Sequence, residues 1–582
     1  MKKQKQPVDR ELVDRSFLSR IEPYLYLLPF LIGIAVFTLY PVINVVLMSF
    51  KEGYSYLSRS FDQWGLANYQ TVLSDPKFAQ AISNTLKYVI LVVPISTCIA
   101  VVVAYLLNQK LRFSALFQTA YFLPMVTSIT AVGLAWKLMY NKNFGIINYL
   151  LSFFGVDPIP WLEKATYSIP ALVIFGIWNI LPFTIILLLS GLQNIDPQYY
   201  TAARVDGSKS LRIFFRITVP LLAPTIFLVC IVNTISCFKV FSELYPLFNG
   251  KPGPFNNLYT VVYYIRYAMM ENRKYGIAAA AALVLFLFIF VFTMVQLLLQ
   301  RRPRGGKQMD SRKISRFFVY FFLTVGALIM LLPFFWMFSS AFKTTQEINR
   351  FPPQWLPSHL SLDNFKRAFE MAPFARYFVN SIIVMVVSVS ITTFTTILAA
   401  FAFSRLRFPG RNLIFSLLLS LMMIPFEMLI ITNYTTVVNL KIYDTLYALI
   451  LPFTSSIFYT YILKNFFDSI SDSLYWSARI DGSSNWRFLW KVMVPMARPS
   501  LMTIVLLNGL ASWNSFMWPM YVIVSKENRT LPWGLQVFTT EAGSYPELLM
   551  AASSVVVFPV VILFLFARKY IVRGVARGGL KG

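Results

Sequence analysis

The chain has 582 residues, of which 57% are hydrophobic and only 13% are charged, and its formal net charge is +27. A soluble chain carries roughly a quarter charged residues, so this composition excludes an ordinary soluble protein and indicates a bilayer as solvent. The positive charge does not indicate nucleic acid, because the basic residues cluster at the ends of apolar segments instead of along one soluble face.

Uncharged runs of about 20 residues, long enough to cross a bilayer, recur along the whole chain. In the first half they cover residues 24–48, 84–107, 116–139, 168–192, 218–238 and 277–299. In the second half they cover residues 317–340, 377–403, 412–434, 446–463, 499–520 and 548–567. The first run is too long for the core of a signal peptide, so we expect an uncleaved membrane anchor.

Lysine and arginine gather before the first run and in the stretch Arg301–Arg316. Cytoplasmic loops of membrane proteins carry such an excess of basic residues. We therefore expect both chain ends and the centre of the chain in the cytoplasm, and the chain itself in the plasma (inner) membrane of a prokaryote.

The two halves of the chain resemble each other in sequence. Residues 199–220 (YYTAARVDGSKSLRIFFRITVP) and 474–495 (LYWSARIDGSSNWRFLWKVMVP) align at a constant offset of 275. Phe50-Lys51 and Pro124 align with Phe342-Lys343 and Pro425 at a larger offset, and Phe238-Lys239 aligns with Trp513-Asn514. The repeat predicts two six-span units in the same orientation, residues 1–300 and 317–582, joined by a basic linker at 301–316.

The segment between the fourth and fifth spans of each half predicts a helix–turn–helix. In the first half a short helix leads to Ala203, Asp206-Gly207 ends it, and a second helical stretch ends at Pro220. Glycine supplies the positive φ that such a turn requires. We expect this element on the cytoplasmic face, where its small residues allow another protein to approach.

The pattern A-A-x-x-D-G, with a proline fourteen residues after the aspartate, resembles the EAA loop of binding-protein-dependent ABC transporter permeases, and it occurs in both halves. The resemblance implies that the loops contact separate ATPase subunits through Ala202, Ala203, Asp206, Gly207, Ala478, Asp481 and Gly482. The leading glutamate of the family is Thr201 or Trp476 here, and Ser477 replaces an alanine. Docking would then rest on shape and on the nearby Arg204 and Arg479.

Residues 238–254 and 513–535 resemble the outer segments of the carbohydrate branch of these permeases, which includes the maltose and glycerol-phosphate importers. The implied fold is an all-α integral membrane protein of the type I (MetI-like) class with about 12 spans, made of two permease subunits fused in one chain. The implied function is import of a sugar or oligosaccharide. The implied partners are two ATPase subunits, which bind ATP and Mg, and an extracellular or periplasmic sugar-binding protein.

The resemblance to the maltose permease also implies a substrate path on the spans before and after the first EAA-like loop. The implied residues are Gly176, Asn179, Ile180, Phe183, Ser236, Cys237 and Val240. Asn179 and Ser236 can bind hydroxyl groups, and Phe183 can stack on a sugar ring. Ordinary helix packing by small residues is the alternative for this set.

Glu427 follows Pro425 within an apolar run. An unpaired charge there costs about 2–3 kcal/mol or more, so Glu427 is a candidate for the substrate path. Alternatively, its carboxylate reaches the outer interface or pairs with a neighbouring side chain.

No G-x-x-x-x-G-K-[ST] loop occurs in the sequence, so we expect ATP to be bound by another chain. Cys98, Cys230 and Cys237 lie in apolar segments and His359 is the sole histidine, so we expect no catalytic residue, metal site or cofactor in this chain. An ion-coupled secondary transporter is the alternative function, although it normally needs titratable residues in its spans. The lack of acidic motifs in the outer loops disfavours a membrane enzyme.

Overall fold

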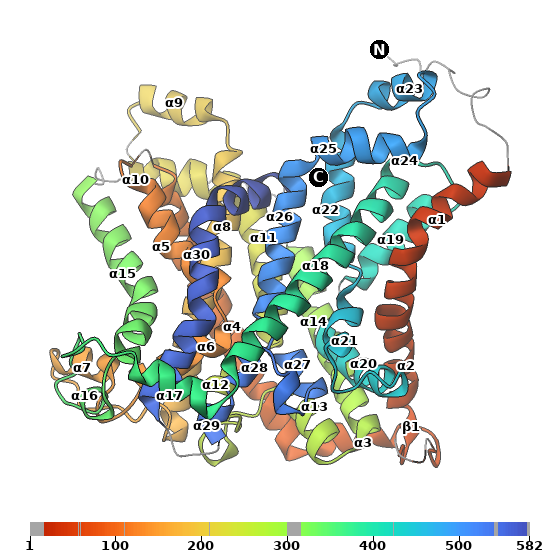
Figure 1. The fold of residues 1–582 in the computed structure, drawn as a ribbon. Coiled ribbons are helices and arrows are strands. Elements are labelled where there is room, and N and C mark those ends of the chain that lie inside the picture. The colour runs from red at the N-terminus through yellow and green to blue at the C-terminus, as the bar shows by residue number, and fades with distance from the viewer. Residues whose placement is uncertain are drawn as a thin grey trace.

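The computed structural model describes residues 17–578 apart from residues 56, 57, 59, 110, 209, 300–315, 423 and 541–544. This part of the chain is a bundle of helices with one two-stranded ribbon, in which β1 (Lys51–Glu52) pairs antiparallel with β2 (Gln63–Trp64) (Figure 1). The predicted linker 301–316 lies outside the described residues except for Arg316, the first residue of a long helix.

Eight helical stretches of the described residues are long and apolar enough to cross a bilayer unbroken. They are Ile21–Ser49, which joins α1 (Phe17–Ile34), η1 (Ala35–Leu39) and α2 (Tyr40–Ser49); α4 (Pro76–Leu107); α8 (Ala165–Gln193); Phe214–Phe238, which joins η2 (Phe214–Thr218) and α11 (Val219–Phe238); α14 (Tyr275–Leu299); α15 (Arg316–Ala341); α18 (Phe374–Arg405); and α30 (Pro546–Gly578).

Four further pairs of helices pass the same test together but bend at a break. The pairs are α5 (Ser114–Val126) with α6 (Ile129–Met139) at 103°, α19 (Arg411–Leu421) with α20 (Phe426–Asn439) at 98°, α21 and η5 (Leu446–Phe453) with α22 (Ile457–Ser469) at 42°, and α24 to α25 (Asn485–Met496) with α26 (Arg498–Trp513) at 79°. If each pair is one span, the described chain has 12, which confirms the predicted all-α architecture. Proline stands at the first two breaks, where Pro124 and Pro425 correspond in the repeat.

The predicted span 499–520 is wrong at its second end. Helix α26 stops at Trp513, and α27 (Met517–Val522) begins after a turn. Trp513 Nε1 donates to the Val556 carbonyl at 3.2 Å, and Asn514 Nδ2 donates to the Val126 carbonyl at 2.9 Å. These two bonds to other spans hold the chain where the helix ends.

Short helices connect the spans. They are α3 (Ala67–Ser74), α7 (Ile146–Ser152), α9 (Pro197–Val205), α10 (Ser210–Ile213), α12 (Leu244–Leu247), η3 (Pro254–Asn256), α13 (Val261–Arg266), η4 (Tyr267–Glu271), α16 (Thr345–Ile348), α17 (Asp363–Met371), α23 (Asp472–Ile480), η7 (Lys526–Asn528), α28 (Leu531–Gly534) and α29 (Val537–Thr540). Helices α9 and α23 lie at one end of the bundle, which we call the loop end, and β1, α7 and α16 lie at the opposite end (Figure 1).

The predicted repeat is visible in matching hydrogen bonds of the two halves. Asn68 Nδ2 donates to the carbonyls of Ser49 and Lys51 at 3.0 and 2.8 Å. Asn364 Nδ2 donates to the carbonyls of Ala341 and Lys343 at 3.0 and 2.8 Å. In both halves the amide therefore closes the turn that follows the first span.

A second matching set ties the start of each second span to the segment before the sixth. Asn84 Nδ2 donates to the Asn257 and Tyr259 carbonyls at 2.8 and 3.0 Å. Asn380 Nδ2 donates to the Glu527 and Arg529 carbonyls at 2.7 and 3.0 Å. The next residue accepts in each case, since Val261 N donates to Thr85 Oγ1 and Leu531 N to Ser381 Oγ.

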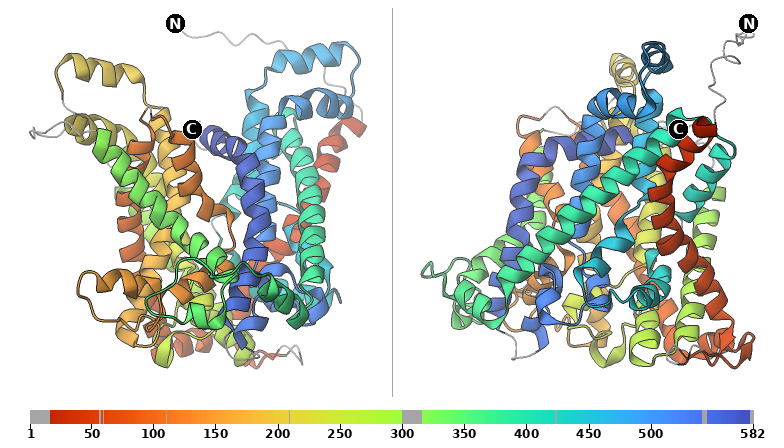
Figure 2. Two further views of the ribbon diagram at one scale, coloured as in Figure 1. Left: turned by 60° about the vertical axis from the view of Figure 1, so that its left-hand side comes forward. Right: turned by 45° about the vertical axis from the view of Figure 1, so that its right-hand side comes forward.

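The first span of each half packs against the other half. Asn44 on α2 donates to Thr432 Oγ1 of α20 at 3.1 Å, and Asn433 donates to the Phe37 carbonyl at 3.1 Å. In the reciprocal contact, Tyr121 Oη on α5 donates to the Leu323 carbonyl of α15 at 3.2 Å. Figure 2 shows the result: the red α1 lies beside the teal α18 of the second half, and the green α15 beside the orange helices of the first.

These amide contacts give a prediction about stability. Asn380→Ala removes two donors and leaves two carbonyls unpaired, so we expect the free energy of unfolding to fall by about 1–3 kcal/mol. Thermal unfolding of the purified chain in detergent measures this. Asn143→Ala, at an exposed position, is the control, and an equal melting temperature for both variants would contradict the role given to Asn380.

Candidate functional site

The two EAA-like loops, residues 199–220 and 474–495, each form the predicted helix and turn. Helix α9 ends at Val205 and α23 at Ile480, and Gly207 and Gly482 follow with φ of 72° and 75°. A Cβ at either glycine would meet nothing within 4 Å. The glycines are therefore needed for their left-handed backbone and not for space.

The same hydrogen bonds close both turns. Ser208 N donates to the Ala203 carbonyl at 2.9 Å, and Ser483 N donates to the Ala478 carbonyl at 2.9 Å. In the second loop Gly482 N also donates to the Arg479 carbonyl at 3.1 Å, which completes a Schellman cap. The pattern A-x-x-D-G is thus a helix stop, with the alanine carbonyl as acceptor.

The second helical stretch of the first loop does not end at Pro220, contrary to the sequence prediction. It runs through η2 into α11 without a break, and Pro220 lies in the first turn of α11. Proline lacks the backbone N–H of an ordinary helix residue, and the wider π turn before it accommodates that loss. In the second loop the break comes at Ala497, after Pro495.

Both short helices expose apolar side chains at corresponding positions. Val205 and Ile480 are 82% and 81% exposed, and Tyr199 and Leu474 are exposed at the start of each helix. All four residues belong to α9 or α23, the short helices at the loop end of the bundle (Figure 1). The two loops thus expose apolar residues at the same positions of the repeat.

The predicted small residues of the loops divide into two groups. Ala202, Asp206 and Asp481 are exposed, whereas Ala203 is buried against its own chain and Ala478 is half-buried. Bulk at Ala203 would therefore disturb the loop itself.

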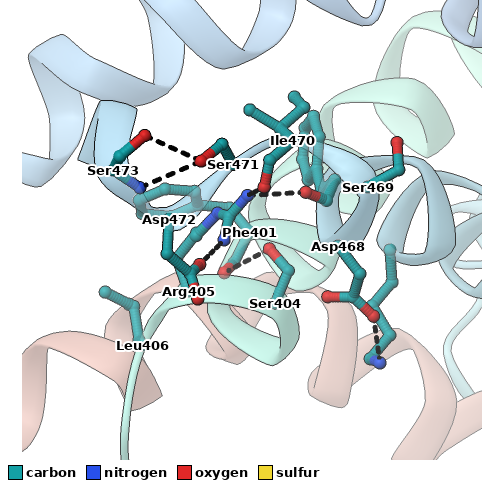
Figure 3. A network of polar contacts seen from close by, with 12 residues as sticks. Phe401, Ser404, Arg405, Leu406, Asp468, Ser469, Ile470, Ser471, Asp472 and Ser473 are labelled. Atoms are coloured by element: carbon teal, nitrogen blue, oxygen red, sulfur yellow. Dashed lines mark hydrogen bonds and ion pairs between the residues drawn. The ribbon is translucent and has the colours of Figure 1, made fainter. Parts of the chain in front are cut away.

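The second loop is held by an arginine from the end of α18. Arg405, whose side chain is 4% exposed, donates to the Asp472 carboxylate on α23. It also donates to the carbonyls of Phe467 and Ile470 at 2.7 and 2.6 Å (Figure 3). One guanidinium thus joins the second span, the end of the fourth span and the loop helix, which fits its five fixed donors.

The start of α1 also contacts the second loop. Asn485 Nδ2 donates to the Glu22 carboxylate at 2.9 Å, and Tyr475 Oη donates to Asn485 Oδ1 at 2.9 Å. The first span of the chain therefore reaches the loop of the other half.

A second candidate site lies where the two halves meet. Lys239 Nζ at the end of α11 is 3.9 Å from Glu427 Oε2 at the start of α20. At the corresponding positions of the repeat, Asn514 Nδ2 donates to the Val126 carbonyl. The end of each fifth span thus lies against the break in the third span of the other half, with a charged contact on one side and a neutral one on the other. Of the alternatives considered for Glu427, the structure shows pairing with a neighbouring side chain, Lys239.

Glu243 extends this cluster and was missed in the sequence. Asn179 Nδ2 is 3.5 Å from Glu243 Oε1. Burial raises the pKa of the Glu243 carboxyl above its ordinary value, while Lys239 acts in the opposite direction. Glu243 stands in a loop segment after the apolar run, so its sequence position gave no sign of burial.

The remaining residues of the predicted path lie around this cluster in different environments. A Cβ on Gly176 would lie 2.1 Å from the Tyr88 hydroxyl oxygen, and Cys237 and Val240 are buried, so these three favour the packing alternative. Asn179, Ile180 and Phe183 are half-buried, and Ser236 is exposed. Among the described residues no group of three or more His, Cys, Asp or Glu could hold a metal ion.

The sequence model of one protein family, described as the binding-protein-dependent transport system inner membrane component, matches the chain twice, over residues 70–305 and 391–577. Each match contains one EAA-like loop.

Several characterised proteins are similar to parts of the chain. The arabinooligosaccharides transport system permease protein AraQ of Halalkalibacterium halodurans is 33% identical over 267 residues, which cover 45% of this chain and 96% of that protein. The lactose transport system permease protein LacF of Rhizobium radiobacter is 34% identical over 257 residues, or 43% of this chain and 85% of that protein. Each of these relatives matches less than half of this chain but most of its own length. This is expected if the chain contains two such units in one polypeptide.

A solved structure of a bacterial alginate ABC transporter, in complex with an alginate pentasaccharide-bound periplasmic protein, is also similar. It is 24% identical, covers 49% of this chain and 96% of the matched chain, and has a TM-score of 0.43.

The Arg405 contacts give a prediction about the second loop. In Arg405→Gln the carbonyls of Phe467 and Ile470 lose their donor, at a cost of about 1–3 kcal/mol. We expect amide hydrogen exchange in α23 to become about fivefold to a hundredfold faster. Arg487→Gln, an exposed arginine of the same loop, is the control, and unchanged exchange in Arg405→Gln would show that this arginine does not hold the helix.

Proposed function

The chain belongs to the family of binding-protein-dependent transport system inner membrane components, and from this premise we propose that it is the membrane-spanning subunit of an ATP-driven importer of a sugar or oligosaccharide. The carbohydrate class is supported by the relatives, one named for arabinooligosaccharides and one for lactose. It is also supported by the uncharged polar groups Asn179 and Ser236 and the ring of Phe183 along the predicted path.

The observation that carries the proposal is the pair of loop helices α9 and α23. Both lie at the loop end of the bundle, and both expose apolar residues at matching positions, Val205 and Ile480. We propose that each receives one separate ATPase subunit, which binds ATP and Mg. Ala202, Asp206 and Asp481, which are exposed beside them, complete the contact, while Gly207 and Gly482 set the turn.

The loop end is then the cytoplasmic side of a prokaryotic plasma membrane, and both chain ends lie on that side. The excess of lysine and arginine in the stretch Arg301–Arg316 supports this orientation. The opposite end receives an extracellular or periplasmic sugar-binding protein. One copy of this chain supplies both halves of the pathway, so the assembly has one copy of it and two ATPase subunits.

The proposal places the transport pathway between the two halves. The cluster of Lys239, Glu427 and Glu243 lies where spans of both halves meet. Contacts between two rigid units change when one unit moves relative to the other, as alternating access requires. The Lys239–Glu427 contact is therefore expected to differ between the inward-open and outward-open states.

The first test adds charge to the exposed apolar residues of the loops. In a Val205→Glu, Ile480→Glu double variant we expect the ATPase subunits to dissociate during purification, because a carboxylate would have to be desolvated in each interface. Co-purification of the ATPases and ATP hydrolysis by the complex measure this. Phe113→Glu, which adds a carboxylate to an exposed residue elsewhere at the loop end, is the control. Unchanged assembly and hydrolysis would remove the docking role.

The same preparations test the alternative function. Uptake that needs only a proton or sodium gradient, with no ATPase subunit present, would show an ion-coupled secondary transporter and overturn the proposal.

The second test concerns the charged contact between the halves. Glu427→Gln removes the carboxylate that lies 3.9 Å from Lys239 Nζ, and we expect the uptake rate to fall about tenfold or more, equal to about 1.4 kcal/mol, with normal assembly. Radiolabelled sugar uptake and recovery of the complex measure the two effects. Glu370→Gln, at an exposed site, is the control. If the Glu427→Gln variant took up sugar at the wild-type rate, the Glu427 carboxylate would have only a structural role.

A further inference from the structure

The second half contains a cavity of about 100 Å³ between α18, η5 (Leu451–Phe453), α26 and α27. Three residues on its wall carry a buried polar atom with no hydrogen-bond partner in the described chain: Ser388 Oγ, Asn508 Nδ2 and Thr530 Oγ1. Their exposed fractions are 2%, 8% and 5%. Buried polar groups are nearly always paired, so three unpaired groups around one cavity are suited to hydrogen-bond a polar ligand.

In the first half the corresponding polar groups are paired. Asn233, the equivalent of Asn508 at the offset of 275, donates to Thr184 Oγ1 at 3.0 Å. Thr260, which corresponds to Thr530, donates to the Val240 carbonyl at 2.9 Å. Both side chains are therefore hydrogen-bonded within the first half, and Thr260 Oγ1 also accepts from Tyr263 N at 3.3 Å.

The first half also fills the space. Tyr88 stands at the position that corresponds to Val384, and its hydroxyl packs tightly against Gly176. Valine is much smaller than tyrosine, so the second half has room where the first has a ring. Ser388, at the position of Val92, adds a hydroxyl to that room.

The walls suit one class of ligand. The rings of Phe453 and Trp518 lie with their centroids 6.5 Å apart and their planes at 81°. Trp518 Nε1 donates to the Ala448 carbonyl at 2.9 Å. Among the described residues, none that lines the cavity is charged. Aromatic surface with a few hydroxyl and amide groups and no charge matches a sugar ring, which has both apolar C–H faces and hydroxyl groups.

We propose that this cavity binds one uncharged sugar ring, as a site of the second half separate from the path predicted on the first. The ring displaces the few water molecules that a space of this size holds, and its hydroxyl groups pair with Ser388, Asn508 and Thr530. The site rests on the proposed function in that the cargo is a sugar. Its occupant is a free monosaccharide or the end unit of an oligosaccharide.

Saturation-transfer NMR of the full chain in lipid nanodiscs tests the site with three probes: arabinose, arabinotriose and a galacturonic acid trimer. We expect saturation to pass from the protein to an uncharged probe and not to the charged trimer. Saturation of arabinose would identify a free monosaccharide site, whereas saturation confined to one end ring of arabinotriose would identify an end-unit site. Saturation of the trimer alone, or of no probe, would overturn the proposal.

Two variants separate binding from folding. Ser388→Val with Thr530→Val removes two unpaired hydroxyls, so the melting temperature should stay equal or rise, while the dissociation constant should increase about tenfold. Val384→Tyr fills the cavity as Tyr88 does in the first half and should abolish the signal. Thr260→Val is the matched control and should keep it. An unchanged dissociation constant in both second-half variants would overturn the proposal.

Failure here is distinguishable from failure of the proposed function. ATP-driven sugar uptake by the complete complex, together with no binding to this cavity, would remove the site alone. Absence of ATP-driven uptake for every sugar would remove the function.

Discussion

Where the chain leaves a helix inside an apolar bundle, its backbone carbonyls have no helical donor and cannot hydrogen-bond to water. Each unpaired carbonyl costs several kcal/mol in a bilayer. Asparagine amides supply the missing donors in this chain, at matching points of both halves. Asn68 and Asn364 close the turn after the first span, and Asn84 and Asn380 hold the segment before the sixth. These bonds join segments on either side of a span or connection, and they fix the span ends on the side of the bundle where α3 lies, opposite the loop end.

The same constraint explains how the halves meet. The third span of each half is broken, and a side chain from the end of the other half's fifth span reaches each break. Asn514 supplies the donor for the Val126 carbonyl, and Lys239 meets the Glu427 carboxylate. The neutral contact is a hydrogen bond to a backbone carbonyl at the break, whereas the charged contact brings Lys239 Nζ to 3.9 Å from a carboxylate that the neutral side lacks. The interface between the halves therefore contains two contacts at equivalent positions of the repeat, one a neutral hydrogen bond and the other a charge pair.

Local features could be predicted from the sequence. Apolar runs gave the spans because a bilayer sets their length, and Asp206-Gly207 gave the turn because only glycine adopts that φ freely. The break of a span could not be predicted, since the helix runs on past Pro220, whereas α5 ends two residues after Pro124. The partner of Glu427 lies in the other half of the chain, and Glu243 becomes half-buried only by folding, so neither follows from neighbouring residues.

The two halves share the residues that hold the spans together, and they differ in residues near the proposed pathway and the EAA-like loops. The asparagine donors and the glycine turns recur in both. In contrast, Asp472, which Arg405 holds in the second loop, corresponds to Pro197 in the first, where no carboxylate is available at that position. Tyr88 fills the space that Val384 leaves open. In a single chain the two units are always paired with each other, so neither must work with a copy of itself. A residue that faces the partner half can therefore change on one side without the matching change on the other, which is the pattern that Lys239 and Asn514 show.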